Sequence, residues 1–271
     1  MTLQGIGLAG CGRMGAGMLA ALRRAGFDAK GFDVRPPAGF GTLAPHVTDE
    51  PAAFTQGLRT LLTVVRDIAQ TDDVLFGAQG FAATPGLERI IVCSTLSPRY
   101  VLSLRDRVPA RITLIDAPMS GAQIAADEAR LSFMLGGSEA DLDAAQPLFA
   151  AMGRHFHRMG GYGAGMQAKV LNNLLAAANT AMTRLVLDWA DDAGLDEDAL
   201  LRLIATSSGQ NWFAAGFETI EFARDGHDPE NTIGILVKDV ASALDAAPEG
   251  ADTALPRTIQ MALRNLKARD R

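Results

Sequence analysis

A lysine and an asparagine lie four residues apart in a long apolar segment, at Lys169 and Asn173. Residues at this spacing share one face of a helix, and Asn172 lies beside them. A lysine among alanines and leucines costs free energy to bury unless it is paired or has a function. Burial or a nearby cation can lower the pKa of a lysine, which then transfers protons. The alternative is a lysine that extends its ammonium group to solvent at a helix end.

A glycine-rich turn near the start of the chain points to a second kind of chemistry, the binding of phosphate. It stands between a short apolar run and a run of helical periodicity. In such a context Gly10 allows the tight turn, Gly12 lets the backbone approach a pyrophosphate, and Gly15 lets the helix pack near the strand. Arg13 and Met14 open the helix, whose free N–H groups attract phosphate. The alternative is a turn that only packs a helix on a strand.

An acidic residue follows the next apolar run and indicates which dinucleotide the turn holds. Asp33 comes about 20 residues past the glycine turn, where a carboxylate accepts the ribose hydroxyls of NAD. Val34 follows it, and then Arg35, which could instead accommodate the 2′-phosphate of NADP. Because a carboxylate repels that phosphate, we expect NAD as the cofactor and keep NADP as the alternative.

Short apolar runs alternate with helical runs over the first 160 residues, as in a parallel α/β sheet. The predicted strands are Ile6–Ala9, Ala29–Phe32, Thr60–Val65, Arg89–Cys93, Arg111–Ile115, Leu131–Leu135 and His155–Met159. Ser97 before Pro98, and Ser138 with Asp141, predict helix starts. Because ligands of such sheets bind outside the carboxyl ends of the strands, we expect a site near Thr95, Asp116–Gly121 and Gly163–Gly165.

The pattern changes after residue 160. Residues 164–193 contain no strong helix breaker and Gly194 follows them, which predicts one helix of about 30 residues. Residues 195–271 show helical faces and no strand alternation. The expected fold class is therefore α/β, with an N-terminal Rossmann-type doubly wound sheet, a long bridging helix and a small all-helical C-terminal domain. The expected domains are a dinucleotide-binding domain at 1–160, an interdomain helix at 161–193 and a helical domain at 194–271.

Composition excludes several classes of protein. The 271 residues carry a net charge of −6 and no basic tract, so nucleic acid and anionic membranes are poor partners. Two cysteines indicate neither a disulfide framework nor a metal site, and the alternating His155 and His157 lack further ligands. The most apolar long stretch contains Lys169, which argues against a membrane-spanning helix. The chain also starts without the basic region of a secretion signal. We therefore expect a cytoplasmic protein that requires no metal.

Four segments together resemble the β-hydroxyacid dehydrogenases, the family that includes 3-hydroxyisobutyrate dehydrogenase and tartronate semialdehyde reductase. They are Gly7–Gly15, Asp116–Gly121, Gly160–Asn173 and Lys238–Asp239, and their order covers nearly the whole chain. The resemblance implies hydride transfer between a nicotinamide cofactor and a small 3-hydroxy acid or the matching semialdehyde. It also implies a homodimer or homotetramer and a C-terminal domain like that of 6-phosphogluconate dehydrogenase.

The resemblance implies a role for individual residues. Lys169 would be the general acid and base, and Asn173 would hold the substrate and orient the lysine. Ser120, Gly121 and Ala122 would contact the substrate carboxylate, although the family commonly has glycine at the position of Ala122. The implied cofactor contacts are Gly10, Gly12, Arg13, Met14, Gly15, Asp33, Val34, Arg35, Val65, Thr95 and Lys238.

Two other functions remain open on the sequence alone. An imine reductase of the same architecture is one, although such enzymes usually lack the lysine at the position of Lys169. A non-catalytic dinucleotide-binding module is the other, although such a module has no need of Lys169.

Overall fold

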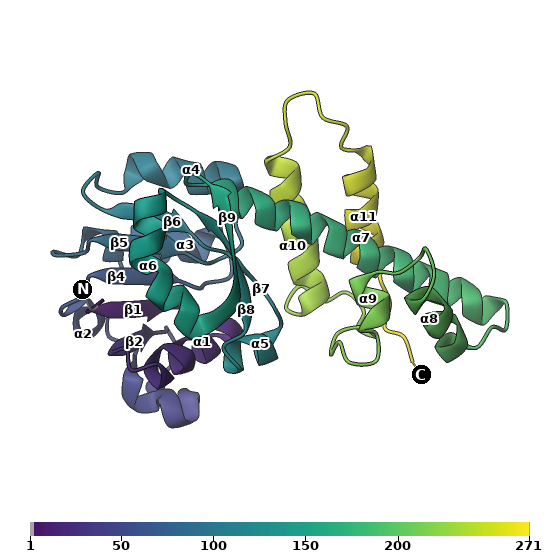
Figure 1. Ribbon diagram of the computed structural model, residues 1–271, viewed down its shortest axis with the longest axis horizontal. Coiled ribbons are helices and arrows are strands. Elements are labelled where there is room, and N and C mark those ends of the chain that lie inside the picture. Colours follow the sequence, from purple (N-terminus) through teal and green to yellow (C-terminus); the bar gives the residue numbers. More distant parts are fainter. Residues whose placement is uncertain (1–2, 271) are drawn as a thin grey trace. The chain divides into compact units, whose positions relative to one another are not determined.

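The computed structural model describes residues 3–270, and the chain divides into two compact units, Met1–Lys169 and Val170–Arg271. Within the described residues, every strand belongs to the first unit, and the second unit is helical (Figure 1). The fold is mixed α/β, as the sequence predicted. No helix of the described residues is long and apolar enough to cross a membrane.

Nine strands of the described residues form one sheet. They are β1 (Ile6–Ala9), β2 (Ala29–Phe32), β3 (Val47–Thr48), β4 (Thr60–Thr63), β5 (Arg89–Val92), β6 (Thr113–Asp116), β7 (Met119–Ser120), β8 (Leu131–Gly136) and β9 (Gly153–Gly160). The seven strands that the sequence predicted are all present, with ends that differ by up to two residues. The two-residue strands β3 and β7 were missed, because so short a pair carries no alternating pattern.

The strand order is β3-β2-β1-β4-β5-β6-β8-β7, and β9 pairs with β8. β1 lies between β2 and β4, with Ile6 opposite both Ala29 and Thr60, and all three strands are parallel. The order of the strands therefore reverses on either side of β1. Doubly wound sheets bind their ligands at this switch point, outside the carboxyl ends of the strands.

The expectation of a parallel sheet is wrong at one edge, where β8 runs antiparallel to β6 and β7. Only Ala117 and Pro118 separate β6 from β7, and ten residues separate β7 from β8. Since both strands are antiparallel to β8, the chain keeps its direction from β6 to β7 and reverses in the connection between β7 and β8. That connection is shorter than the crossover of about a dozen residues or more that a parallel neighbour needs.

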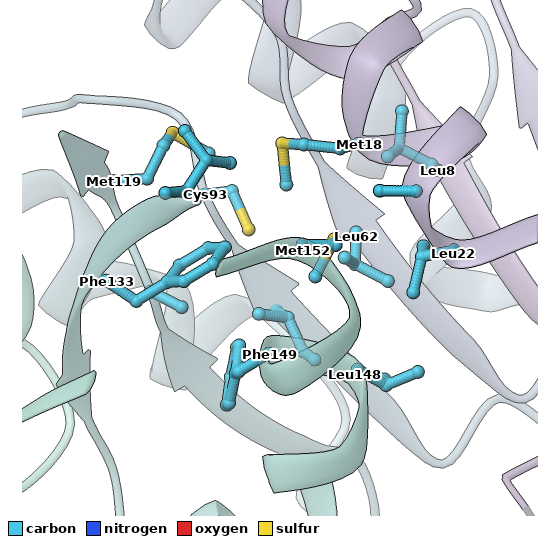
Figure 2. Close-up of a cluster of buried hydrophobic side chains, with 14 of the residues drawn as sticks. Leu8, Met18, Leu22, Leu62, Cys93, Met119, Phe133, Leu148, Phe149 and Met152 are labelled. Atoms are coloured by element: carbon cyan, nitrogen blue, oxygen red, sulfur yellow. The ribbon is translucent and has the colours of Figure 1, made fainter. Parts of the chain in front are cut away.

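Helices cover both faces of the sheet in the first unit. They are α1 (Arg13–Arg24), α2 (Pro51–Thr55), α3 (Ile68–Leu75), α4 (Pro98–Arg107), α5 (Gln123–Asp127) and α6 (Glu139–Met152), with 3₁₀ segments η1 (Pro37–His46) and η2 (Phe81–Ala83). Met18 and Leu22 of α1 pack with Phe149 and Met152 of α6 over strand residues such as Leu62 (Figure 2). A second core on the other face contains α2, α3 and α4.

Two helix starts follow the sequence prediction, with one difference in detail. α4 begins with Pro98 after Ser97, and α6 begins after Ser138, whose hydroxyl accepts the backbone N–H of Asp141. The Asp141 carboxylate does not return to the backbone of Ser138, as a capping box requires, but accepts the Ser138 hydroxyl at 2.6 Å.

Five helices make up the described part beyond the sheet. They are α7 (Ala164–Asp192), α8 (Glu197–Ala205), α9 (Trp212–Ala215), α10 (Thr232–Asp245) and α11 (Ala254–Arg264). α7 starts in the first unit and continues into the second, where its buried face packs on two apolar clusters. The longest helix thus matches the long helix predicted for residues 164–193.

Candidate active site

The glycine turn connects β1 to α1 and has the geometry that a pyrophosphate needs. Gly10 has a φ of +96°, and a Cβ there would lie 2.6 Å from the carbonyl oxygen of Val64. A Cβ on Gly15 would lie 1.9 Å from the carbonyl oxygen of Gly10, which shows how closely α1 approaches the turn. Only glycine satisfies both positions without a shift of the backbone.

Gly12 is different, since a Cβ there would have no heavy atom within 4 Å. Gly12 is the N-cap of α1, and no side chain caps the helix, so Arg13 and Met14 present a helix start to open space. Backbone N–H groups and the positive end of the helix dipole attract anions at such a place. The residues present therefore fit the pyrophosphate of a dinucleotide, which these backbone groups would hold.

Asp33 lies at the carboxyl end of β2, beside the turn, and both of its oxygens are engaged. Oδ1 accepts the backbone N–H of Arg35 at 3.1 Å and its Nε at 2.9 Å. Oδ2 accepts the backbone N–H of Cys11 at 2.9 Å and Nη2 of Arg35 at 3.1 Å. Burial raises the pKa of Asp33, but the hydrogen bonds from Arg35 outweigh it and hold that pKa below its usual value.

Arg35 is fixed on its other sides as well. Its Nη2 also donates to the carbonyl of Cys11 at 3.1 Å, and its guanidinium carbon lies 4.7 Å from the ring centre of Phe40. Stacking on the ring adds to the ion pair with Asp33. Val34, between the two, is 74% exposed. The adenosine end of a bound cofactor would thus meet a paired carboxylate and guanidinium rather than an isolated acid.

Cys11 lies inside this turn, but its thiol is unreactive. Burial, with the nearby Asp33 carboxylate, raises the pKa of its thiol to about 12. Cys93, at the end of β5, is also buried, and burial raises its pKa. Neither thiol forms a disulfide, and neither has the low pKa of a nucleophile.

The ends of β4 and β5 are tied together beside the glycine turn. The Ser94 hydroxyl accepts the backbone N–H of Val65 at 2.9 Å and donates to the carbonyl of Thr63 at 3.3 Å. Thr95 follows Ser94 in the same loop. These contacts place Val65 and Thr95 after neighbouring strands, on the edge of the sheet where the sequence predicted them.

Ser120 ends β7, opposite Ser132 of β8, and is partly exposed. Gly121 has a φ of +127°, and a Cβ there would meet the Cβ of Ala125 at 2.7 Å. Ala122 is the N-cap of α5, and no side chain caps that helix. The three predicted carboxylate contacts therefore form one continuous turn.

Asp116, at the end of β6, holds the start of α7. Its Oδ1 accepts the backbone N–H of Gly163 at 2.6 Å, and its Oδ2 accepts that of Met166 at 2.5 Å. A carboxylate at this place satisfies two N–H groups of the first turn and complements the helix dipole. Burial raises the pKa of Asp116, while the hydrogen bonds from Gly163 and Met166 lower it.

Lys169 lies one helical turn after this anchor and is 6% exposed. The close packing of the helix start leaves no space for larger residues, because a Cβ on Gly165 would lie 2.3 Å from the carbonyl oxygen of Met134. The Sδ of Met166 also lies 3.3 Å from the backbone N of Leu96. The lysine is therefore a buried side chain on a firmly positioned turn, and the alternative of a lysine extended into solvent is wrong.

Asn173, four residues further along α7, is 8% exposed and belongs to a polar group of the second unit. Its Nδ2 donates to Oδ2 of Asp239 at 2.5 Å, and Lys238 Nζ lies 2.8 Å from Oδ1 of the same carboxylate. Asn172 donates to the Asn173 oxygen at 3.2 Å. Two predicted site residues, Asn173 and Lys238, thus meet on Asp239.

Sequence reasoning missed the structural roles of Asp116 and Asp239. Both stand in the segments that carry the family resemblance, and Asp116 begins one of the segments expected near the site, but neither was given a role of its own. A signal was available for Asp116, since an acid that directly ends a buried strand at the ligand edge is rarely unpaired. The sequence contains no comparable signal for Asp239, because its partner Asn173 is 66 residues away.

Known proteins share this arrangement. A family model described as the NAD binding domain of 6-phosphogluconate dehydrogenase matches residues 5–161. A second, described as NAD-binding of NADP-dependent 3-hydroxyisobutyrate dehydrogenase, matches residues 163–269. L-threonate dehydrogenase of Cupriavidus necator is 31% identical over 201 residues, which cover 73% of this chain and 67% of that protein.

Two further comparisons agree with these matches. The 3-hydroxyisobutyrate dehydrogenase of Pseudomonas aeruginosa is 31% identical over 184 residues, covering 66% of this chain and 62% of that protein. The crystal structure of 3-hydroxyisobutyrate dehydrogenase from Salmonella typhimurium has a TM-score of 0.81 at 24% identity, and the alignment covers 95% of this chain and 92% of that one.

The doubly wound sheet, its glycine turn and the matching family models define an oxidoreductase that uses NAD or NADP. Within that class, the chain belongs to the β-hydroxyacid dehydrogenase family.

Proposed function

We propose that this protein transfers a hydride between a small 3-hydroxy acid and NAD, with NADP as the alternative cofactor. The observation that carries the proposal is the placement of Lys169. It is 6% exposed, on a helix whose start Asp116 holds at the ligand edge of a dinucleotide-binding sheet. A buried amine at that edge is suited to proton transfer.

In the direction of oxidation, the carbon that carries the hydroxyl loses a hydride and the hydroxyl loses a proton. The bound nicotinamide would supply the hydride acceptor, and Lys169 Nζ would take the proton. Asn173, held by Asp239, would orient the substrate. The turn of Ser120, Gly121 and Ala122 would bind the carboxylate through its hydroxyl and backbone N–H groups.

The remaining predicted residues would hold the cofactor. Gly10, Gly12, Arg13, Met14 and Gly15 would bind its pyrophosphate. Asp33, Val34 and Arg35 would contact its adenosine end, Val65 and Thr95 would lie along it, and Lys238 would be a further cofactor contact. The proposed domains are those expected from the sequence: 1–160 for the cofactor, 161–193 for the linking helix and 194–271 for the helical domain.

The substrate class is supported by the names of the relatives. Those at about 30% identity are called L-threonate dehydrogenase, 3-hydroxyisobutyrate dehydrogenase and NAD-dependent L-serine dehydrogenase. Each name specifies a small acid with a hydroxyl near its carboxylate. We therefore propose a substrate of three or four carbons of the same kind.

We also propose that the protein acts in the cytoplasm as a homodimer or homotetramer. Two free, buried thiols are typical of a protein in a reducing compartment. The assembly is supported by the large apolar side chains that the helices of the second unit expose, among them Leu175 and Trp189.

The proposal is tested by incubating the protein with a panel of small 3-hydroxy acids and either NAD or NADP, while the absorbance of the reduced cofactor is recorded. Lys169→Ala should lose at least about a hundredfold in kcat while it still binds the reduced cofactor. Lys169→Arg, which keeps the charge but cannot release a proton, is the matched control and should also be inactive. Turnover retained in either variant contradicts the role of Lys169. Turnover of a cyclic imine, but of no hydroxy acid, favours imine reduction.

A further inference from the structure

Tyr162 lies just before α7 and contacts a helix that comes much earlier in the chain. Its hydroxyl donates to the carbonyl oxygen of Val101 at 2.8 Å, and the two residues are 61 positions apart. Val101 belongs to α4, and the ring of Tyr162 packs against the buried cluster that contains Val101 and Leu104. The tyrosine therefore fastens the start of α7 to α4 (Figure 1).

A second hydrogen bond joins the same two parts of the chain. The backbone N–H of Leu96 donates to Sδ of Met166 at 3.3 Å, and both residues are buried. Leu96 directly follows Thr95, and Met166 lies three residues before Lys169. A thioether sulfur is a weak acceptor, so the bond of the Tyr162 hydroxyl is the stronger of the two.

The backbone between the two bonded residues also lies directly against α4. Gly163 has a φ of +95°, and a Cβ there would lie 2.7 Å from Cδ2 of Leu102. We call the three pairs Tyr162–Val101, Met166–Leu96 and Gly163–Leu102 the α4–α7 contact. All of these residues belong to the first unit, so the contact is part of one compact body.

The α4–α7 contact joins the segments that carry two proposed site residues. Thr95 lies in the loop between β5 and α4, and Lys169 lies in the second turn of α7. In the proposed reaction the hydride leaves a carbon of the substrate, and the proton leaves the oxygen bonded to that carbon. The cofactor and the lysine must therefore reach adjacent atoms, and a displacement of about 1 Å can lower the rate a hundredfold.

The Tyr162 hydroxyl is suited to holding a position and not to transferring a proton. Burial raises the pKa of Tyr162 above its usual value, and the carboxylate of Asp116 raises it further. Of the other nearby groups, Arg105 lowers this pKa and Tyr100 raises it. The hydroxyl therefore keeps its proton at neutral pH, and it donates that proton to a backbone carbonyl.

We propose that Tyr162 is a positioning residue, which sets the distance between the Thr95 loop and Lys169 through its bond to α4. The inference rests on the proposed hydride transfer and deepens it. Asp116 fixes the start of α7 to the end of β6, and Tyr162 fixes the same turn to α4. Without the hydroxyl, the turn would open more often on the side of α4.

The first experiment measures how readily Lys169 reacts, and it needs no substrate. The full chain is treated briefly with acetic anhydride at one fixed pH. Mass spectrometry then gives the acetylation of Lys169 relative to that of Lys267, which is exposed. Tyr162→Phe keeps the ring and removes only the hydroxyl. It should raise the rate of labelling of Lys169 at least about threefold, because a turn that opens more often exposes the buried amine.

Tyr100→Phe is the matched control, because it removes the same group from α4 itself. The Tyr100 hydroxyl donates to Oδ1 of Asp72 on α3 at 2.8 Å, and Asp72 keeps its ion pair with Arg107 in the variant. Labelling of Lys169 should be that of the wild type. Thermal unfolding establishes that each variant is folded. Unchanged labelling in folded Tyr162→Phe, or an equal increase in both variants, would overturn the proposal.

The second experiment measures turnover of a hydroxy acid that the protein accepts. Tyr162→Phe should lower kcat at least about threefold, while KM for the acid and the Kd of NADH change by less than about twofold. The glycine turn and Asn173 are untouched in this variant. A lower stability with an unchanged kcat would overturn the positioning role. If no hydroxy acid is turned over, the proposed function fails, and the labelling still decides whether Tyr162 holds Lys169 in place.

Discussion

Asp116 and Met166 lie 50 residues apart in the sequence, yet the carboxylate of the first accepts the backbone N–H of the second at 2.5 Å. This bond joins the end of β6 to the first turn of α7, three residues before Lys169. The position of the proposed proton carrier thus depends on Asp116, which acts through the backbone of the helix start. Asp116 is a positioning residue.

Asp116→Asn should therefore lower both stability and turnover. The asparagine amide presents one oxygen and one NH₂ group to two N–H donors, so one of them loses its acceptor. We expect a loss of about 1–3 kcal/mol in the free energy of unfolding. Cofactor affinity should change less than kcat, since the glycine turn is untouched. Unfolding in urea and steady-state kinetics measure both effects.

The effect on stability should depend on pH in a defined direction. Burial raises the pKa of Asp116, so the folded protein binds this proton more tightly than the unfolded chain. The proton-linked part of the stability from this group is then complete below the unfolded pKa of about 3.9 and is lost as the pH rises through the higher folded value. Above that value the two hydrogen bonds to the carboxylate remain as its contribution. The stability difference between wild type and Asp116→Asn should shrink over that interval. A difference that grows with pH would contradict this assignment.

Gly12→Ala should separate cofactor binding from stability. An added Cβ meets no atom of the protein within 4 Å, and the φ of −68° suits alanine, so thermal unfolding should be unchanged. The methyl group would nevertheless occupy the space that a pyrophosphate needs, and the Kd of NADH should rise at least about tenfold. Gly39→Ala, also in open space but outside the turn, is the control and should alter neither quantity. A normal Kd in Gly12→Ala would remove the turn from the cofactor site.

Arg35→Gln tests which cofactor the Asp33–Arg35 pair selects. The substitution removes the two side-chain hydrogen bonds from Arg35 to the carboxylate and frees it for ribose hydroxyls. It also removes the cation that could face a 2′-phosphate. The ratio of kcat/KM for NADP to that for NAD should fall at least about tenfold. The opposite variant, Asp33→Asn, should raise that ratio, and equal ratios in all three proteins would show that the pair has no part in the choice.

Asp239→Ala should affect the substrate end. Asn173 Nδ2 and Lys238 Nζ both lose their acceptor, and a buried amide without one costs about 1–3 kcal/mol of stability. We expect a higher KM for the acid because Asn173 is no longer oriented. Asp239→Asn keeps an oxygen for Asn173 and should recover most of that KM. A KM that stays low in Asp239→Ala would show that Asn173 needs no support.

Much of the first unit could be predicted because its sequence signals are local. A four-residue buried strand such as Ile6–Ala9 is bounded by glycine. The six residues that follow it contain the complete glycine pattern of a dinucleotide-binding turn. The antiparallel edge could not be predicted, because β7 has only two residues and its direction depends on its neighbours. The same holds for the bonds of Asp116 and Asp239. Each joins segments that are more than 45 residues apart, and no periodic pattern reports such a distance.

Arg35 illustrates a different difficulty. The sequence offered Asp33 and Arg35 as alternatives, one for each cofactor. In the structure they form one bidentate pair, stacked on Phe40, so neither charge acts alone. The preference for NAD or NADP therefore depends on the ion pair of Asp33 and Arg35 and not on either side chain alone.

α7 runs unbroken through Lys169 and Asn173, with no glycine or proline between them. The rise of a helix then sets their separation along its axis at about 6 Å. The helix thus fixes the distance between the two proposed site residues. A substrate that Asn173 orients and whose hydroxyl must reach Lys169, as we propose, would be selected first by the distance between the two groups that these side chains contact. Related enzymes that accept different acids would therefore differ in the part of the pocket that faces the rest of the substrate. The spacing between Lys169 and Asn173 would stay the same.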